Sequence, residues 1–164
     1  MSSDVHPVPA SSITTWDHEA DVVIAGFGIA GVTAAVEAAR AGADVLVLER
    51  AGSWGGAASM AGGFVYLGGG TPIQKACGFH DSVENMTTFL NVAMGPGADE
   101  NRIADYCAGS LEHFDWLVGC GVPFKAEFWS EPGWEPMGDQ GLAYSGGENS
   151  YPFNTIAEPA PRGH

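Results

Sequence analysis

An apolar stretch followed by three spaced glycines constrains the fold of this chain more than any other feature. Residues 22–50 read VVIAGFGIAGVTAAVEAARAGADVLVLER. The apolar run predicts a buried strand over 20–25, and the alanine-rich stretch after it predicts a helix over 29–41 that ends at Gly42. A second apolar run, Val45–Leu48, predicts another strand. Two parallel strands joined by a helix form a βαβ unit, so the sequence predicts an α/β fold.

The glycines between the first strand and the helix have the spacing GxGxxG. Gly26 permits a tight turn, Gly28 lets a pyrophosphate approach the backbone, and Gly31 allows the helix to pack closely. The start of the helix, at Ile29 and Ala30, offers unpaired N–H groups to phosphates. The pattern predicts a Rossmann-like, dinucleotide-binding βαβ unit. The alternative is a glycine-rich turn of an ordinary α/β domain.

Glu49 ends the second predicted strand, near the spacing of about twenty residues that this pattern requires of its acidic residue. Its carboxylate can accept hydrogen bonds from both ribose hydroxyls of an adenosine. It also disfavours a 2′-phosphate by charge repulsion. These residues by themselves leave FAD and NAD open.

The rest of the chain predicts helices and then an irregular segment. The glycine-rich stretch 51–70 predicts a loop or a short helix between loops. Asp81 and Glu84 have the spacing of a capping box for a helix over 81–94. Asp99 is expected to open one long helix that reaches Val118, followed by a short strand over 122–124. Residues 125–164 are rich in glycine, proline and aromatic residues and show no period. We expect a flexible tail over 1–19, a nucleotide-binding part over 20–124 and an irregular segment over 125–164.

Composition excludes several classes of partner. The net charge of −14 predicts repulsion from nucleic acid and from anionic membranes. The longest apolar stretch is too short and too rich in glycine to span a bilayer, and the first twenty residues do not form a secretory signal. The three cysteines form no CxxC pair, which favours buried, reduced thiols and a cytoplasmic location. No spacing of histidine, cysteine or carboxylate residues suggests a metal site.

The stretch ERAGSWGGAASMAGG resembles the second cofactor segment of the fumarate reductase and 3-ketosteroid dehydrogenase flavoproteins. The matching positions are Glu49, Arg50, Gly55, Gly56, Ala57, Ser59, Gly62 and Gly63. In that family the segment lines the pyrophosphate and the isoalloxazine ring, so the resemblance implies FAD as the cofactor. DYCAGSLEHFDWLVGCGVPF and APRGH resemble later segments of the family more loosely. Family members are several times longer, so the resemblance implies the N-terminal part of an FAD-binding domain, without the substrate-capping region.

Departures from the family pattern limit what the resemblance implies. Succinate dehydrogenase-type members bind FAD covalently through a histidine in this segment. This chain has Ser53 and Trp54 there and no histidine, so we predict non-covalent FAD. The tyrosines at 66, 106, 144 and 151 match no family motif, although Tyr144 and Tyr151 can reach a substrate from the aromatic segment. Arg162 and His164 can clamp a substrate oxygen or begin a helix. The catalytic residues therefore stay unknown.

These observations predict an FAD-dependent oxidoreductase acting on a C–C bond next to a carbonyl. The aromatic segment and the lack of charge clamps favour a ketosteroid-like small molecule. Three alternatives stay open: an enoate reductase of the fumarate reductase type, an inactive nucleotide-binding fragment, and an NAD-binding dehydrogenase domain. We also expect the aromatic residues of 125–164 to be exposed and aggregation-prone when the chain is alone.

Overall fold

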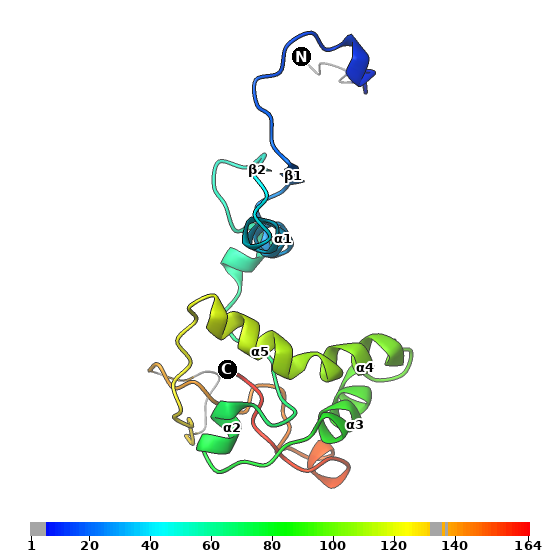
Figure 1. Ribbon diagram of the computed structural model, residues 1–164. Coiled ribbons are helices and arrows are strands. Elements are labelled where there is room, and N and C mark those ends of the chain that lie inside the picture. The colour runs from blue at the N-terminus through cyan, green and yellow to red at the C-terminus, as the bar shows by residue number, and fades with distance from the viewer. Residues whose placement is uncertain (1–5, 132–135, 137) are drawn as a thin grey trace. The chain divides into compact units, whose positions relative to one another are not determined.

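The computed structural model describes residues 6–131, 136 and 138–164 (Figure 1). They divide into two compact units, Met1–Gly62 and Gly63–His164. Each unit is described by itself. None of the helices in the described ranges has the length and apolar character needed to cross a bilayer.

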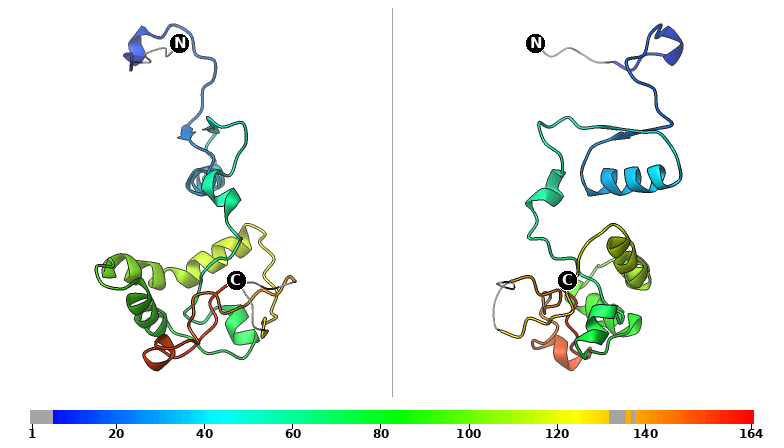
Figure 2. Two further views of the ribbon diagram at one scale, coloured as in Figure 1. Left: turned by 180° about the vertical axis from the view of Figure 1, so that it is seen from behind. Right: turned by 60° about the vertical axis from the view of Figure 1, so that its left-hand side comes forward.

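The first unit contains the predicted βαβ arrangement. Strand β1 (Val22–Ala25) is followed by helix α1 (Ile29–Arg40) and strand β2 (Val45–Leu48). The strands pair in parallel, from Val22 opposite Val45 to Ala25 opposite Leu48. Figure 2 shows α1 running alongside the two strands. A short 3-10 helix, η1 (Ala10–Ser12), precedes this arrangement, and another, η2 (Gly56–Met60), follows it. The predicted order of the elements is confirmed, and η2 is the short helix expected in the glycine-rich stretch.

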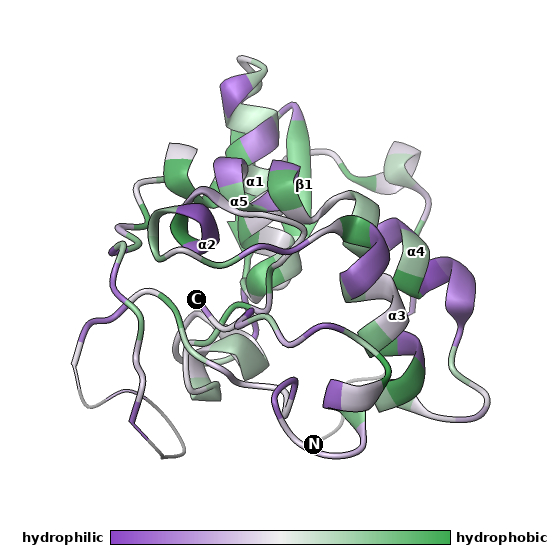
Figure 3. Cartoon of the chain, turned by 90° about the horizontal axis from the view of Figure 1, so that it is seen from below, coloured by the Kyte–Doolittle hydropathy of each residue, from purple (hydrophilic) through white to green (hydrophobic). Residues whose placement is uncertain are grey.

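Four α-helices and a 3-10 helix make up the regular structure of the second unit, as far as it is described. They are α2 (Pro72–Ala76), α3 (Val83–Met94), α4 (Glu100–Ala108), α5 (Ser110–Gly119) and η3 (Phe153–Thr155). Hydrophobic and hydrophilic residues are mixed along α3 and α4 (Figure 3). The buried residues of each helix, Met86 and Phe89 on α3 and Ile103 and Cys107 on α4, are three or four positions apart, as is typical of helices with one buried face. One core cluster joins Met86, Ile103 and Cys107, and another is formed by Leu67, Ile73, Phe114 and Leu142.

The predicted long helix over 99–118 is wrong in one respect. Asp99 does cap its start, since the side chain accepts from the Arg102 N–H at 3.2 Å. The helix is divided at Gly109, a residue of low helix propensity. The next side chain, Ser110, is buried and donates to the Gly68 carbonyl at 3.1 Å, which fixes the start of α5. No strand forms over 122–124; Phe124 instead stacks on Phe114, with ring centroids 5.0 Å apart.

The predicted cap at Asp81 is also wrong. Ser82 caps α3 by accepting from the Asn85 N–H at 3.1 Å. The Asp81 carboxylate binds Arg162 instead, with two contacts of 2.8 and 2.7 Å, and both side chains are 0% exposed. Gln74 adds a hydrogen bond of 3.2 Å to the same carboxylate. The residue that sequence reasoning assigned to a helix end therefore joins the start of α3 to the end of the chain.

The C-terminal residues lie in the core of this unit. Leu67 donates its N–H to the Arg162 carbonyl at 2.8 Å, and Val65 donates to the His164 carbonyl at 3.0 Å. On the other side, Gly163 exchanges two backbone hydrogen bonds with Ala143. The end of the irregular segment is thus paired through its backbone with residues 65–67 on one side and with Ala143, earlier in the same segment, on the other.

Three of the five described aromatic residues of the irregular segment, Phe128, Tyr144 and Phe153, pack against other rings, contrary to our expectation. Phe128 packs on Phe79, with ring centroids 4.7 Å apart, and Phe153 packs on Phe89 at 5.5 Å. Tyr151, at 83% exposure, does face solvent as expected. Trp134 lies outside the described residues. The sequence showed the aromatic residues of this segment but not their partners, which come from the helical region before it.

Candidate functional site

The glycine turn follows the carboxyl end of β1 and is hydrogen-bonded to the carboxyl end of β2. Gly26 adopts a φ of +102°, which glycine tolerates without strain. Its N–H donates to the Leu48 carbonyl at 2.7 Å. The turn therefore starts at the carboxyl edge of the parallel pair, where α/β sheets bind their ligands.

Gly31 has no room for a side chain. A Cβ built on it would lie 1.9 Å from the Gly26 carbonyl oxygen and 3.4 Å from the Cγ2 of Ile24. The spacing predicts that α1 packs closely at Gly31. In the structure, Gly31 lies closer to the turn at Gly26 than to Ile24 on the strand. Any larger residue at this position must displace the backbone of the turn.

The N-terminus of α1 is open to an anion. Gly28 is the N-cap residue, and no side chain caps the helix. The Val32 N–H bonds the Gly28 carbonyl at 2.9 Å, so the N–H groups of Ile29 and Ala30 precede the first intrahelical bond. A Cβ on Gly28 would meet only Gly55 and Gly56 atoms, both at 4.0 Å. A pyrophosphate can therefore approach this backbone, and the residues present fit the phosphates of FAD.

Glu49 is held at the mouth of the turn by backbone N–H groups. Ala51 donates to one carboxylate oxygen at 2.8 Å, and Phe27 donates to the other at 2.7 Å. The hydrogen bonds from Ala51 and then Phe27 lower the pKa of Glu49 below its usual range, so the carboxylate stays ionised. Each oxygen keeps a lone pair for a ribose hydroxyl. Arg50 is exposed, and its charge also acts to lower the pKa of Glu49.

The structure brings the second glycine segment against the first. Gly55 donates its N–H to the Phe27 carbonyl at 2.7 Å and forms a bridge with Gly28. A Cβ on Gly56 would lie 3.3 Å from the Gly28 Cα. The sequence predicts that both segments bind the cofactor. In the structure, Gly28 of the first segment lies beside Gly55 and Gly56 of the second.

The remaining residues of the second segment have less defined surroundings. Ser59 donates its hydroxyl to the Gly56 carbonyl at 2.8 Å, so the serine also shapes the loop. Ala57 is exposed, as are Gly62 and Gly63, and nothing lies within 4 Å of a Cβ on Gly63. The flavin contacts of these residues stay a prediction. Ser53 and Trp54 are exposed too, and neither side chain can form the covalent histidine link.

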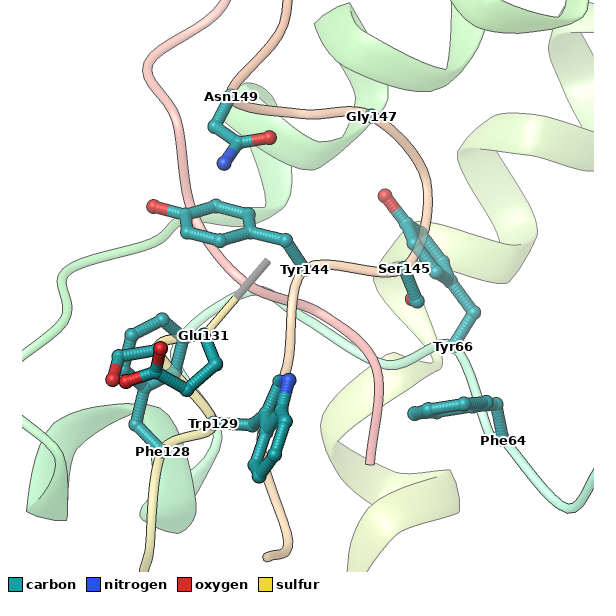
Figure 4. Close-up of a pocket in the computed structure, with 10 residues that line it drawn as sticks. Phe64, Tyr66, Phe128, Trp129, Glu131, Tyr144, Ser145, Gly147 and Asn149 are labelled. Carbon is teal, nitrogen blue, oxygen red and sulfur yellow. The ribbon is translucent and has the colours of Figure 1, made fainter. Parts of the chain in front are cut away.

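The second unit contains a pocket of about 810 Å³, and half of the residues that line it are aromatic. Figure 4 shows Phe64 and Tyr66 on one side, with Phe128 and Tyr144 on the other and Trp129 between them. The other lining residues are polar or small: Ser130, Glu131, Ser145, Gly147 and Asn149. Its size is that of a small-molecule site. Sequence reasoning named Tyr144 as able to reach a substrate but missed the others; the only signal was the cluster of aromatic residues in a segment without a period.

Arg162 and His164 do not face this pocket. Arg162 is bound to Asp81, and its guanidinium lies over the Phe89 ring, 5.3 Å from its centroid. The His164 ring is buried, with nitrogen contacts to the Thr71 hydroxyl at 3.2 Å and to the Gly141 carbonyl at 2.9 Å. Burial lowers the pKa of His164, which keeps the ring neutral. Both side chains support the fold and are not available to clamp a substrate.

Known proteins share these features. The family model described as "FAD binding domain" matches residues 21–156. A crystal structure of 3-ketosteroid-delta4-(5alpha)-dehydrogenase from Rhodococcus jostii RHA1, in complex with 4-androstene-3,17-dione, is 70% identical and superposes with a TM-score of 0.88 over 98% of this chain and 33% of that chain. The 3-oxo-5-alpha-steroid 4-dehydrogenase of Comamonas testosteroni is 32% identical over 98% of this chain and 31% of its own length. The acrylate reductase flavoprotein subunit of Shewanella woodyi is 39% identical over 66% of this chain and 22% of its own length.

The chain spans about a third or less of the length of these relatives. The matched region nevertheless includes both glycine segments, Glu49 and the helices of the second unit. FAD is therefore the nucleotide expected to bind at the GxGxxG turn and Glu49. The alternative of an NAD-binding domain is set aside. The family model matches most residues of this chain, so the chain belongs to the FAD binding domain family.

Proposed function

We propose that this chain is the N-terminal, FAD-binding part of an oxidoreductase that acts on a C–C bond next to a carbonyl group. The observation that carries the proposal is the cradle made by the uncapped start of α1, the turn at Gly26–Gly31 and the ionised Glu49. When bound, FAD supplies a two-electron acceptor for the hydride that leaves one carbon while the neighbouring carbon loses a proton. The residues of this chain bind and orient that group.

Each part of the cradle has a separate role. The N–H groups at the start of α1 receive the pyrophosphate, and Gly28 leaves room for it. Glu49 accepts the ribose hydroxyls of the adenosine. Gly56, Ala57, Ser59, Gly62 and Gly63 provide backbone with little side-chain bulk for the rest of the cofactor. Non-covalent attachment is part of the proposal, because no histidine occurs in this segment.

A ketosteroid-like substrate is favoured over a small carboxylic acid. An acid such as fumarate or acrylate needs cationic side chains to bind its carboxylate. The described lining of the aromatic pocket contains no lysine or arginine and includes the carboxylate of Glu131. The steroid complex of the 70% identical structure supports the same choice. The acrylate reductase relative keeps the enoate reductase alternative worth testing.

The finer fold and location belong to the proposal as well. We infer that β1 and β2 belong to a Rossmann-like, doubly wound sheet in the whole protein. Val23 on β1 is 58% exposed and Ile29 on α1 is 66% exposed, which leaves apolar surface for further elements to cover. The boundaries at 20 and 125 and the cytoplasmic location stay predictions.

Turnover with matched substrates tests this function. We expect the full-length protein that contains this chain, loaded with FAD, to oxidise 5α-androstane-3,17-dione to 4-androstene-3,17-dione with an artificial electron acceptor, and acid precipitation to leave the flavin in the supernatant. Reduction of acrylate or fumarate by a reduced dye, without steroid oxidation, would instead support the enoate reductase. FAD binding without turnover of any of these compounds would support the nucleotide-binding fragment.

A further inference from the structure

Three buried polar atoms of the second unit make no hydrogen bond to any described residue, although their side chains pack around one another. They are the Tyr66 hydroxyl oxygen, Oε1 of Glu148 and Nη1 of Arg162. The Glu148 side chain is 1% exposed and that of Arg162 is 0% exposed, so bulk water does not reach either charged group. A buried polar atom without a partner destabilises a fold, and three of them together indicate that a bound molecule connects them.

Phe89 brings Tyr66 and Arg162 together. The Tyr66 ring stacks on the Phe89 ring with centroids 6.4 Å apart, and the Arg162 guanidinium lies over the same ring, 5.3 Å from its centroid. Burial acts to lower the pKa of Arg162, but Asp81 and then Tyr66 raise it. The phenol is therefore close to the cation.

Gly146 brings Glu148 to the same phenol. The Gly146 N–H donates to Oε2 of Glu148 at 3.0 Å, which leaves Oε1 unbound. A Cβ on Gly146 would lie 3.3 Å from Oε1 of Glu148 and 3.1 Å from Cε2 of Tyr66, the ring carbon next to the one that carries the hydroxyl. Figure 4 shows the Tyr66 hydroxyl directed toward the loop at Gly147. Burial and then the charge of Glu148 raise the pKa of Tyr66, so the hydroxyl keeps its proton.

The buried ion pair leaves one nitrogen of Arg162 for this cluster. Nε donates to the Asp81 carboxylate at 2.8 Å, and Nη2 donates to it at 2.7 Å. These two bonds use one edge of the planar guanidinium, and Nη1 belongs to the rest of the group. The Arg162 side chain can therefore bind Asp81 and a second partner at the same time.

The chemistry of the three atoms defines what can bind between them. Nη1 only donates, Oε1 of the Glu148 carboxylate only accepts, and a hydroxyl does both. The Glu148 charge repels an anion, and the Arg162 charge repels a cation. The ligand must therefore be small, neutral and able both to donate and to accept. Water meets these conditions, and buried waters typically make about three hydrogen bonds to otherwise unsatisfied groups.

We propose that one ordered water molecule binds between the Tyr66 hydroxyl, Oε1 of Glu148 and Nη1 of Arg162. The water accepts from Nη1 and from the hydroxyl, and it donates one proton to Oε1. Tyr66 lines the aromatic pocket, and so does the loop 144–149 that carries Glu148. The water thus joins two walls of the pocket to the buried Asp81–Arg162 pair, whichever molecule the pocket takes.

A crystal structure of the full-length, FAD-loaded protein, at a resolution that shows ordered water, tests the site directly. We expect one density peak with the strength of a water oxygen, about 2.5–3.2 Å from each of the three atoms. Direct hydrogen bonds among the three side chains with no peak between them would overturn the proposal. A peak with the density or coordination of an ion would overturn it too.

Tyr66→Phe tests the contribution of the hydroxyl, because the variant keeps the ring on Phe89 and removes one ligand of the water. We expect the melting temperature of the full-length, FAD-loaded protein to fall by about 1–3 °C, the effect of one lost buried hydrogen bond. Tyr151→Phe is the matched control, since its side chain is 83% exposed, and it should melt like the wild type. A Tyr66→Phe variant that also melts like the wild type would show that the hydroxyl binds no water. Neither experiment depends on turnover, so the proposed function stands or fails separately.

Discussion

Replacing Arg162 with methionine will lower the free energy of unfolding by about 3–5 kcal/mol, the cost of removing one partner of a buried ion pair. The Asp81 carboxylate and the Arg162 guanidinium are both 0% exposed, so water cannot take the place of the lost cation. Methionine keeps most of the apolar volume beside Phe89, which confines the change largely to charge and hydrogen bonding. Urea denaturation followed by circular dichroism measures the loss.

Arg102→Met is the matched control. Arg102 pairs with Asp99 at 3.2 Å, but its side chain is 87% exposed, so this variant should lose less than about 1 kcal/mol. Acid gives a second check. Although burial raises the pKa of Asp81, the hydrogen bonds from Arg162 and Gly69 bring it below its usual value. The stabilisation is therefore full above about pH 4 and is lost as the pH falls through the lower, folded-state pKa. Equal losses for both variants at pH 7 would contradict the role assigned to the buried pair.

Gly31→Ala will weaken FAD binding by roughly 100-fold, which corresponds to about 2.7 kcal/mol. The added methyl group would lie 1.9 Å from the Gly26 carbonyl oxygen, and no side-chain rotation can relieve this distance, because the helix backbone fixes the Cβ position and the oxygen belongs to the backbone of the turn. The turn must open, and opening it moves Phe27 away from Glu49 and Gly55. Titration of the apoprotein with FAD, followed by quenching of flavin fluorescence, gives the affinity.

Gly52→Ala makes the same change in the same unit at a site with space. Nothing lies within 4 Å of a Cβ on Gly52, and its φ is outside the left-handed region, so FAD affinity should stay within about twofold of the wild type. If Gly31→Ala also bound FAD like the wild type, the contact between the helix and the turn would not determine the shape of the cradle.

The first unit could be predicted closely from the sequence because its determinants are local. The strand Val45–Leu48 begins and ends where its apolar run does, and α1 ends one residue before its predicted limit. The contacts of Gly26, Gly31 and Glu49 all lie within one βαβ unit, so the spacing of these residues in the sequence predicts where they lie in the structure. Gly28 and Gly56 come into contact because only a short loop separates the end of β2 from Gly56.

The second unit depends on contacts between residues far apart in the chain. Asp81 is a residue type that often caps helices. Ser82 caps α3 instead, because the Asp81 carboxylate is bound to the buried Arg162. Helix α2 was missed although Thr71 and Gln74 form a capping box with Pro72 at the first helical position, a signal visible in the sequence. The aromatic pocket had no such signal, because Phe64 and Trp129 come together only through tertiary packing.

Comparing the binding of FAD and FMN tests the central claim most directly. FMN carries the same isoalloxazine ring but lacks the adenosine that Glu49 is expected to recognise and the pyrophosphate that the start of α1 is expected to bind. Equilibrium dialysis of the purified apoprotein with each flavin gives both dissociation constants. The account predicts that FAD binds at least about 100-fold more tightly, which corresponds to about 2.7 kcal/mol of recognition by the adenosine half. Equal binding of FAD and FMN would show that the glycine turn and Glu49 do not recognise the dinucleotide.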